Sequence, residues 1–174
     1  MKKLFSLVLT LALLLTAVSA FAEGSKEEPT VGGTVVDKPE IGISFIDDTD
    51  ASAAAIKAFG DAKDAGEALP LPEDVLALIP EGFGTVNEMV TAQFGDGVDQ
   101  LTEDALINFV FDTAYAEGQK VIVLIGILPE AEGDIEWKVF EGTGKADGSV
   151  DVTVTKDVFE KVKTNPFLIG VISE

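Results

Sequence analysis

Cysteine, histidine and arginine are all absent from the 174 residues of this chain. Without cysteine there is no disulfide framework, so a folded domain must rely on burial of apolar side chains. Without histidine, Ser–His and Cys–His catalytic arrangements are excluded, and zinc loses its usual nitrogen ligand. Without arginine, no guanidinium can grip phosphate or carboxylate with two hydrogen bonds. Polar chemistry is left to carboxylates, lysine and the single Tyr115.

Positive charge is also scarce. Twelve lysines face 31 acidic residues, which gives a formal net charge of −19. Such a surface repels nucleic acid and anionic lipid, so we expect neither as a partner. The simplest interpretation of the acidity is solubility outside the cell, and a cationic partner is the alternative.

The first residues have the pattern of a secretory signal peptide. Lys2 and Lys3 precede an apolar run over 4–18, and Ala20-Phe21-Ala22 provides the small residues required by signal peptidase. A membrane anchor is less favoured, because the run is shorter than the roughly 20 apolar residues that span a bilayer. We therefore predict a signal peptide over 1–22 and a secreted, extracellular chain without membrane association after cleavage. Loss of the two lysines changes the net charge from −19 to −21.

Composition divides the remaining chain into three parts. Residues 23–33 are polar and rich in glycine, proline and glutamate, and predict a flexible leader. Residues 34–66 predict short strands plus a helix, which Thr49 or Asp50 can cap and Gly66 can end. Residues 67–174 predict a β-domain, which opens with a short helical piece that begins near Pro72. Whether 34–66 pack into that domain stays open at this level.

Apolar residues alternate with polar ones through most of the second half. The pattern predicts strands near 86–93, 105–112, 120–128, 134–142, 148–155 and 166–173, with a short helix after Thr155 or Asp157. Short strands at this spacing predict a mainly β fold, an antiparallel immunoglobulin-like β-sandwich with short helices and a helical N-terminal segment. The run VIVLIGIL is apolar on both faces and predicts a central, doubly covered strand.

The pair Asp147-Gly148 predicts a hairpin. Such pairs favour two-residue type I′ turns, which would place Lys145 opposite Val150. Ile135, Trp137 and Val139 would then share one core face with Val150, Val152 and Val154. Asp147 is accordingly interpreted as a turn residue and Asp151 as a solvent-side strand residue, in preference to a calcium site.

No catalytic residue, cofactor site or metal site is predicted. The acidic stretch DGVDQLTED offers calcium candidates, namely Asp96, Asp99, Glu103 and Asp104, but it lacks the ligand spacing of an EF-hand loop. A solvated loop is the preferred interpretation. Trp137 is interpreted as a core residue, with a carbohydrate-stacking platform as the alternative.

Six stretches of the chain resemble a recurrent immunoglobulin-like module. They are LPEDVLALIPEGF, VNEMVTAQF, GQKVIVLIGI, IEWKVFEGTG, DGSVDVTVT and NPFLIGVIS. Such modules occur in secreted and cell-surface proteins of anaerobic gut Firmicutes. The resemblance covers residues from about 69 to 174 and implies an extracellular, non-catalytic role with no assigned site residues.

We therefore expect a secreted, non-enzymatic module for cell-surface interaction or assembly, with an unknown protein or glycan as its partner. Two alternatives remain open. One is a small carboxylate-dependent glycan hydrolase, and the other is a calcium-dependent binding module.

Overall fold

The computed structural model describes residues 32–129 and 133–174. The expected signal peptide and residues 23–31 of the expected leader lie outside the described residues. The described residues form one compact unit. Within the described ranges, no helix has the length and hydropathy needed to cross a membrane.

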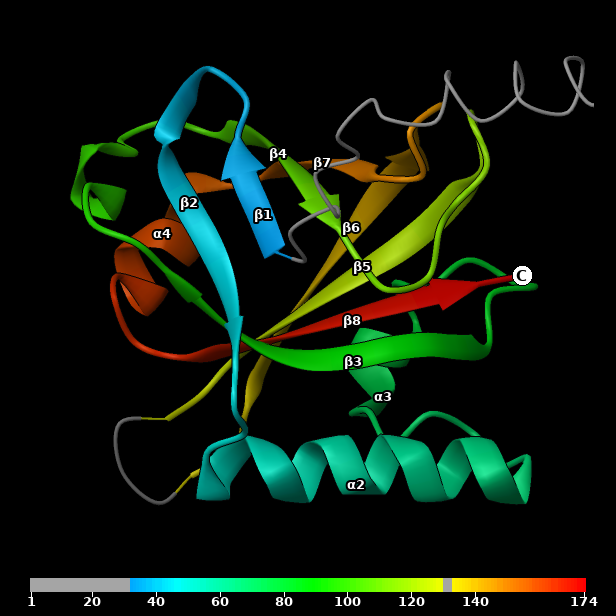
Figure 1. Ribbon diagram of the computed structural model, residues 1–174. Helices are drawn as coiled ribbons and strands as arrows, with labels where there is room; N and C mark the ends of the chain where they lie inside the picture. Colours follow the sequence, from blue (N-terminus) through cyan, green and yellow to red (C-terminus); the bar gives the residue numbers. More distant parts are fainter. Residues whose placement is uncertain (1–31, 130–132) are drawn as a thin grey trace, which may run out of the picture. The chain divides into compact units, whose positions relative to one another are not determined.

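Eight antiparallel strands form a closed barrel (Figure 1). In chain order they are β1 (Gly32–Val35), β2 (Lys38–Ile46), β3 (Thr85–Phe94), β4 (Ala105–Val110), β5 (Lys120–Ile127), β6 (Glu136–Gly144), β7 (Val150–Val154) and β8 (Phe167–Ser173). The order around the barrel is β1-β2-β3-β8-β5-β6-β7-β4, and β4 pairs back with β1.

The predicted immunoglobulin-like sandwich is therefore wrong, although the prediction of a mainly β chain is confirmed. β1 pairs with β2 on one side and with β4 on the other, so it closes the sheet on itself. Gly33 permits this close approach, because a Cβ there would lie 2.8 Å from the Phe109 ring. The open question about 34–66 is also answered, since β1 and β2 are strands of the same barrel.

Apolar side chains fill the barrel interior and form what we call the inner core. Val35, Ile43, Phe109 and Val152 are among its buried members. The predicted helix after Thr155 is present as α4 (Lys156–Val162), and it adds Val158, Phe159 and Val162 to the same core. The interior is thus packed with apolar side chains.

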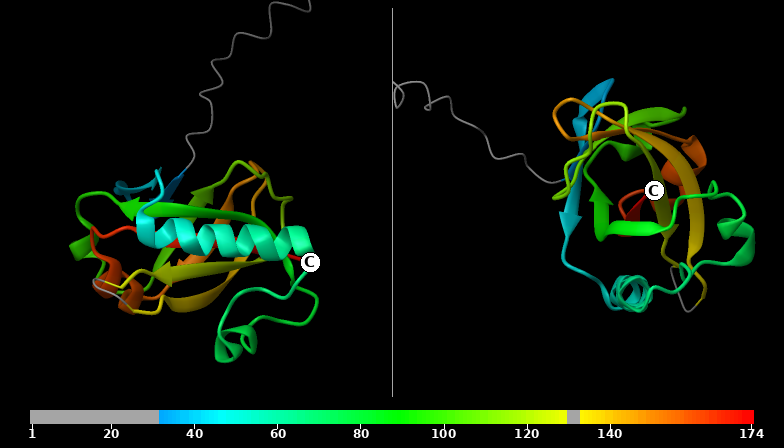
Figure 2. Two further views of the ribbon diagram at one scale, coloured as in Figure 1. Left: turned by 90° about the horizontal axis from the view of Figure 1, so that it is seen from below. Right: turned by 90° about the vertical axis from the view of Figure 1, so that its right-hand side faces the viewer.

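A second cluster, the outer core, lies between the outside of the barrel and two helices (Figures 1 and 2). The helices are α2 (Asp50–Ala65) and the short α3 (Glu73–Leu76). The predicted ends of α2 are confirmed: Thr49 is its N-cap, in a capping box with Ser52, and Gly66 ends it in the left-handed conformation.

The buried strand β5 separates the two cores. Ile122 and Leu124 belong to the outer core, whereas Val121, Val123 and Ile125 belong to the inner core. The prediction of a central strand covered on both faces is confirmed.

The hairpin between β6 and β7 has a different register from the predicted one. Gly144 lies opposite Val150, and the Lys145 N–H donates to the Ser149 carbonyl at 2.8 Å. Ala146, Asp147 and Gly148 therefore form a three-residue loop, in which Gly148 has φ +89°. The single-residue difference reverses the faces of β6 relative to β7.

The predicted common core face is consequently wrong. Trp137 and Val139 pack against the outer core, while Val150, Val152 and Val154 point into the barrel. Trp137 is a core residue as predicted, and its ring centroid lies 5.5 Å from that of Phe59 on α2. Asp147 remains a turn residue, where its carboxylate accepts from the Ser149 N–H at 3.0 Å.

Candidate functional site

A cleft of about 750 Å³ opens where the loop after β3 meets α4. The loop contains a short 3₁₀-helix, η1 (Val98–Gln100), which begins after Gly97 in a left-handed conformation. Residues 96–102 form one wall, and residues 159–164 form the other. We call this the η1–α4 cleft. Figure 1 shows α4 beside the green segment that contains η1, at the same end of the barrel.

The floor of the η1–α4 cleft is apolar and its rim is charged. Val98, Leu101 and Phe159 line it and are buried. The exposed charged residues of the lining are Asp96, Asp99, Glu160 and Lys163. The ion pairs formed within the described part of the chain involve other side chains, so these four charges are open to solvent and to a ligand.

Lys163 has an unusual backbone conformation. Its φ of 45° and ψ of −119° make it the one non-glycine residue with positive φ in the described ranges. Its N–H donates to the Phe159 carbonyl at 3.0 Å. Such strain costs on the order of 1–3 kcal/mol and is found disproportionately at functional sites. At this position it turns the chain at the end of α4, on the rim of the cleft.

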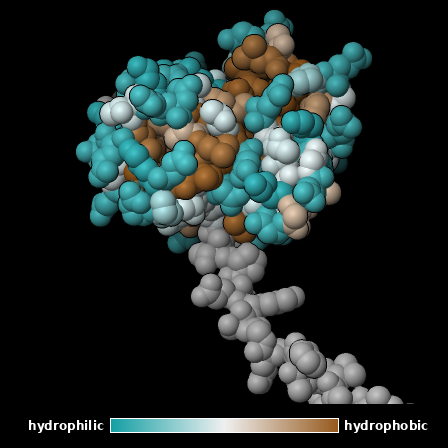
Figure 3. All heavy atoms as spheres, turned by 90° about the horizontal axis from the view of Figure 1, so that it is seen from above, coloured by the Kyte–Doolittle hydropathy of each residue, from teal (hydrophilic) through white to brown (hydrophobic). Residues whose placement is uncertain are grey.

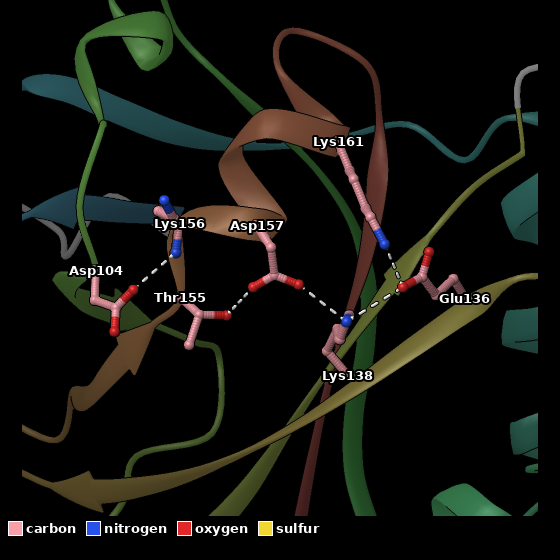
Figure 4. A network of polar contacts seen from close by, with 7 residues as sticks. All are labelled: Asp104, Glu136, Lys138, Thr155, Lys156, Asp157 and Lys161. Atoms are coloured by element: carbon pink, nitrogen blue, oxygen red, sulfur yellow. Dashed lines mark hydrogen bonds and ion pairs between the residues drawn. The ribbon is translucent and has the colours of Figure 1, made fainter.

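A polar network holds α4 against the barrel (Figure 4). The Asp104 carboxylate accepts from the Lys156 N–H at 3.0 Å, which ties the start of α4 to the segment before β4. Lys138 on β6 contacts Asp157 at 2.9 Å and Glu136 at 3.2 Å. Lys161 pairs with the same Glu136 carboxylate. The wall of the cleft that α4 supplies is therefore anchored at both ends of the helix.

The pKa values of this network shift in the directions that ion pairing produces. Hydrogen bonds from Lys161 and then Lys138 lower the pKa of Glu136. Hydrogen bonds from Thr155 and then Lys138 lower the pKa of Asp157. The bond to Asp157 is the main reason that the pKa of Lys138 is raised. Because these groups are partly exposed, their ion pairs add little to the stability of the fold, and the main effect of the network is to position α4.

The four acidic residues singled out in the sequence are divided between two places. Asp96 and Asp99 line the η1–α4 cleft, whereas Glu103 and Asp104 line a neighbouring cleft of about 240 Å³. Within residues 32–129 and 133–174, no group of three or more His, Cys, Asp or Glu residues is arranged to hold a metal ion. The interpretation of this stretch as a solvated loop, in preference to a calcium site, stays a prediction to be tested.

Sequence reasoning missed Glu160 and Lys163. Both lie in or just after a short helix, where charged residues normally face solvent, and no local pattern connects them to residues 96–102. Only the packing of α4 against the η1 loop places them on the same rim.

A second polar feature surrounds Glu88 on β3. Its carboxylate accepts from the N–H groups of Asp112 and Thr113 at 3.5 and 3.4 Å, and burial raises its pKa. Tyr115 is 3% exposed, and its hydroxyl has no partner in hydrogen-bond geometry among the described residues. Burial raises the pKa of Tyr115 to about 12. Neither Glu88 nor Tyr115 lines the η1–α4 cleft.

Comparison of the chain with protein-family models, curated proteins and solved structures found no match. These comparisons therefore do not test the resemblance to extracellular modules of gut Firmicutes. The closed barrel differs from the sandwich which that resemblance implies.

Proposed function

We propose that this protein is a secreted, non-enzymatic binding module for cell-surface interaction or assembly, and that it binds its partner in the η1–α4 cleft. One observation carries the proposal: an open cleft of about 750 Å³ combines a buried apolar floor with charged rim residues that have no ion-pair partner in the described part of the chain. Concave sites with apolar walls and a few placed polar groups are typical of ligand binding.

The rim indicates the chemistry of the ligand. Three of its four charges are negative, namely those of Asp96, Asp99 and Glu160. They favour a cationic group, while Val98, Leu101 and Phe159 offer an apolar surface for the carbon chain that carries it. A lysine side chain of a protein partner has both features, since its stem is apolar and its tip charged. Each exposed ion pair adds only about 0–1 kcal/mol, so contact with the floor must supply most of the affinity.

Two-dimensional NMR of the mature protein tests the proposal, with Nα-acetyl-lysine methylamide as the probe and the norleucine analogue as its uncharged control. The lysine probe should shift the amide signals of residues 96–102 and 159–164, and added salt should weaken the effect. Asp99→Asn should reduce binding several-fold, whereas Asp64→Asn on α2 should not. If these segments do not shift, or if norleucine binds equally well, the proposed charge recognition is wrong.

A second candidate function is glycan hydrolysis, because three carboxylates line one cleft and glycosidases use carboxylate pairs. Such an enzyme also needs a carboxyl group that stays protonated near neutral pH. Burial raises the pKa of Glu88, but Glu88 lies outside the cleft. Release of reducing sugar from a polysaccharide panel, abolished in both Asp99→Asn and Glu160→Gln, would replace the binding proposal with hydrolysis.

A further inference from the structure

Residues 67–84 form a second exposed feature, which does not contribute to the η1–α4 cleft. Leu71 and Val75 are buried and fasten the segment to the outer core. Leu78, in contrast, is 65% exposed, and the only other large apolar side chain exposed in the described ranges is Val36. Figure 2 shows the segment projecting from the side of the barrel, and Figure 3 shows apolar surface on the part that projects at the top of its view.

Two hollows meet at this segment. One, of about 350 Å³, lies among residues 67–69, 76 and 79–84. The other, of about 140 Å³, lies between the segment and the start of β5, beside Ile122. Pro80 and Phe83 line both hollows. The partly buried side chains of Leu69, Leu76 and Ile79 add to the apolar surface. The segment therefore offers two recesses that an apolar side chain can enter, together with the exposed Leu78, which lines neither recess but precedes Ile79 and Pro80 of the larger one.

Prolines and backbone hydrogen bonds restrain the segment. Pro70, Pro72 and Pro80 restrict its backbone. The Leu76 N–H donates to the Pro72 carbonyl at 2.9 Å, and the Leu78 N–H donates to the Val75 carbonyl at 3.0 Å. Leu78 is thus presented from a hydrogen-bonded turn anchored in the outer core. Such preorganisation lowers the conformational entropy that a binding event would cost.

Charge limits what can cover this surface. Residues 67–84 include Glu67, Glu73, Asp74 and Glu81 and contain no lysine. The smaller hollow adds Lys120 and Glu141 from the barrel, so the carboxylates still outnumber the lysine at this surface. A second copy of a chain with net charge −19, or an anionic lipid surface, would be repelled. A basic segment would instead be attracted, because its lysine or arginine residues would meet these carboxylates at the edge of the apolar contact.

We propose that residues 67–84 form a docking surface for an amphipathic basic segment of another protein. Apolar side chains of that segment pack on Leu78 and enter the recess beside Phe83, and its basic residues face the surrounding carboxylates. This surface is independent of the η1–α4 cleft. Occupation of both would let one molecule bridge two partners.

Fluorescence anisotropy with four labelled synthetic peptides tests the proposal. The peptides share one amphipathic template and combine leucine with lysine, leucine with glutamate, leucine with serine, or serine with lysine. The Leu/Lys peptide should bind the mature protein at least tenfold more tightly than the others. Leu78→Ser should weaken that binding about tenfold or more, since it removes a leucine side chain that the bound peptide would bury. Val36→Ser, the matched exposed site, should leave it unchanged.

Other outcomes would overturn the inference. Equal binding of the Leu/Lys peptide by Leu78→Ser and wild type would exclude Leu78 as a contact, once circular dichroism shows both proteins folded. Equal binding of the Leu/Glu peptide would exclude charge recognition. A dimer that Leu78→Ser dissociates in sedimentation would identify a second copy as the occupant. Loss of peptide binding in Asp99→Asn but not in Leu78→Ser would place the peptide in the cleft, which supports the proposed function and refutes this surface.

Discussion

Trp137 can report which side of the barrel wall a substitution affects, because it is the only tryptophan in the chain. It packs against the outer core, where the Phe59 ring lies 5.5 Å away between centroids. Phe59 is 2% exposed, so Phe59→Ala removes a buried aromatic ring. The expected cost is about 3–5 kcal/mol of unfolding free energy. Loss of the ring also lets water reach the indole, so the native emission maximum should move to the red.

Val152→Ala is the matched change in the inner core. Val152 is 1% exposed and points into the barrel from β7. The substitution removes two methyl-sized groups at about 0.8 kcal/mol each, and the cavity it leaves brings the expected loss to about 2 kcal/mol. Native tryptophan emission should stay at its wild-type wavelength, because Trp137 lies on the other face of the sheet.

Urea unfolding followed by far-ultraviolet circular dichroism gives both free energies, and fluorescence before the transition gives the native emission maximum. The two-core arrangement requires both variants to lose stability and only Phe59→Ala to shift the emission. A red shift in Val152→Ala equal to that in Phe59→Ala would refute it. Such a result would favour the single core face that a two-residue hairpin turn predicts.

Four further outcomes follow from local geometry and charge. Gly144→Ala should lower the free energy of unfolding, followed by thermal melting, by about 1–3 kcal/mol, because its Cβ would lie 2.2 Å from the Ala116 carbonyl oxygen. Gly60→Ala in α2 should raise the free energy of unfolding by about 1 kcal/mol, because a Cβ at Gly60 would have no atom within 4 Å. A change of the same sign in both variants would contradict the packing around these glycines. The carboxylates paired with Lys138 have lowered pKa values, so they stabilise the fold above their ordinary pKa and lose that effect as pH falls. Lys138→Met should therefore flatten the fall of melting temperature in acid, and an unchanged profile would argue against the network. Tyr115, the only tyrosine, should ionise at about pH 12 in the folded protein when followed by ultraviolet absorbance. Because its pKa is raised on folding, Tyr115 stabilises the fold at pH values below its pKa in the unfolded chain, about 10, and that stability is lost as pH rises through its pKa in the folded protein. Ionisation of the folded protein near pH 10 would contradict the burial of Tyr115. Millimolar calcium and a chelator should give equal melting temperatures, whereas a calcium site would raise the value by several degrees.

Local sequence signals located most elements correctly because their causes are local. The N-cap of α2 depends on Thr49 and on Ser52 three residues later, and its end depends on the left-handed conformation of Gly66. The positions of β3 to β8 follow from apolar alternation, and β5 follows from a run that is apolar on both faces. Each of these features is decided within a few neighbouring residues.

The β6–β7 hairpin marks where local reasoning became insufficient. The sequence placed the turn at Asp147, but it did not determine whether the loop has two or three residues. The alternation of apolar residues could not decide between the two loop lengths, because Val152 is buried in the inner core while Trp137 is partly buried against the outer core. When both faces of a sheet are covered, alternation no longer identifies a single inside.

The tertiary structure alone decided the closure of the barrel and the composition of the site. β1 pairs with β4 through residues more than 70 positions apart, such as Gly32 with Val110. Sandwiches and barrels contain similar short strands, and the difference lies in which edges meet. In the same way, Asp96 and Asp99 share a cleft with Glu160 and Lys163 only because α4 packs against the η1 loop. The free energy of such contacts depends on the whole arrangement of strands, so no short stretch of sequence carries it.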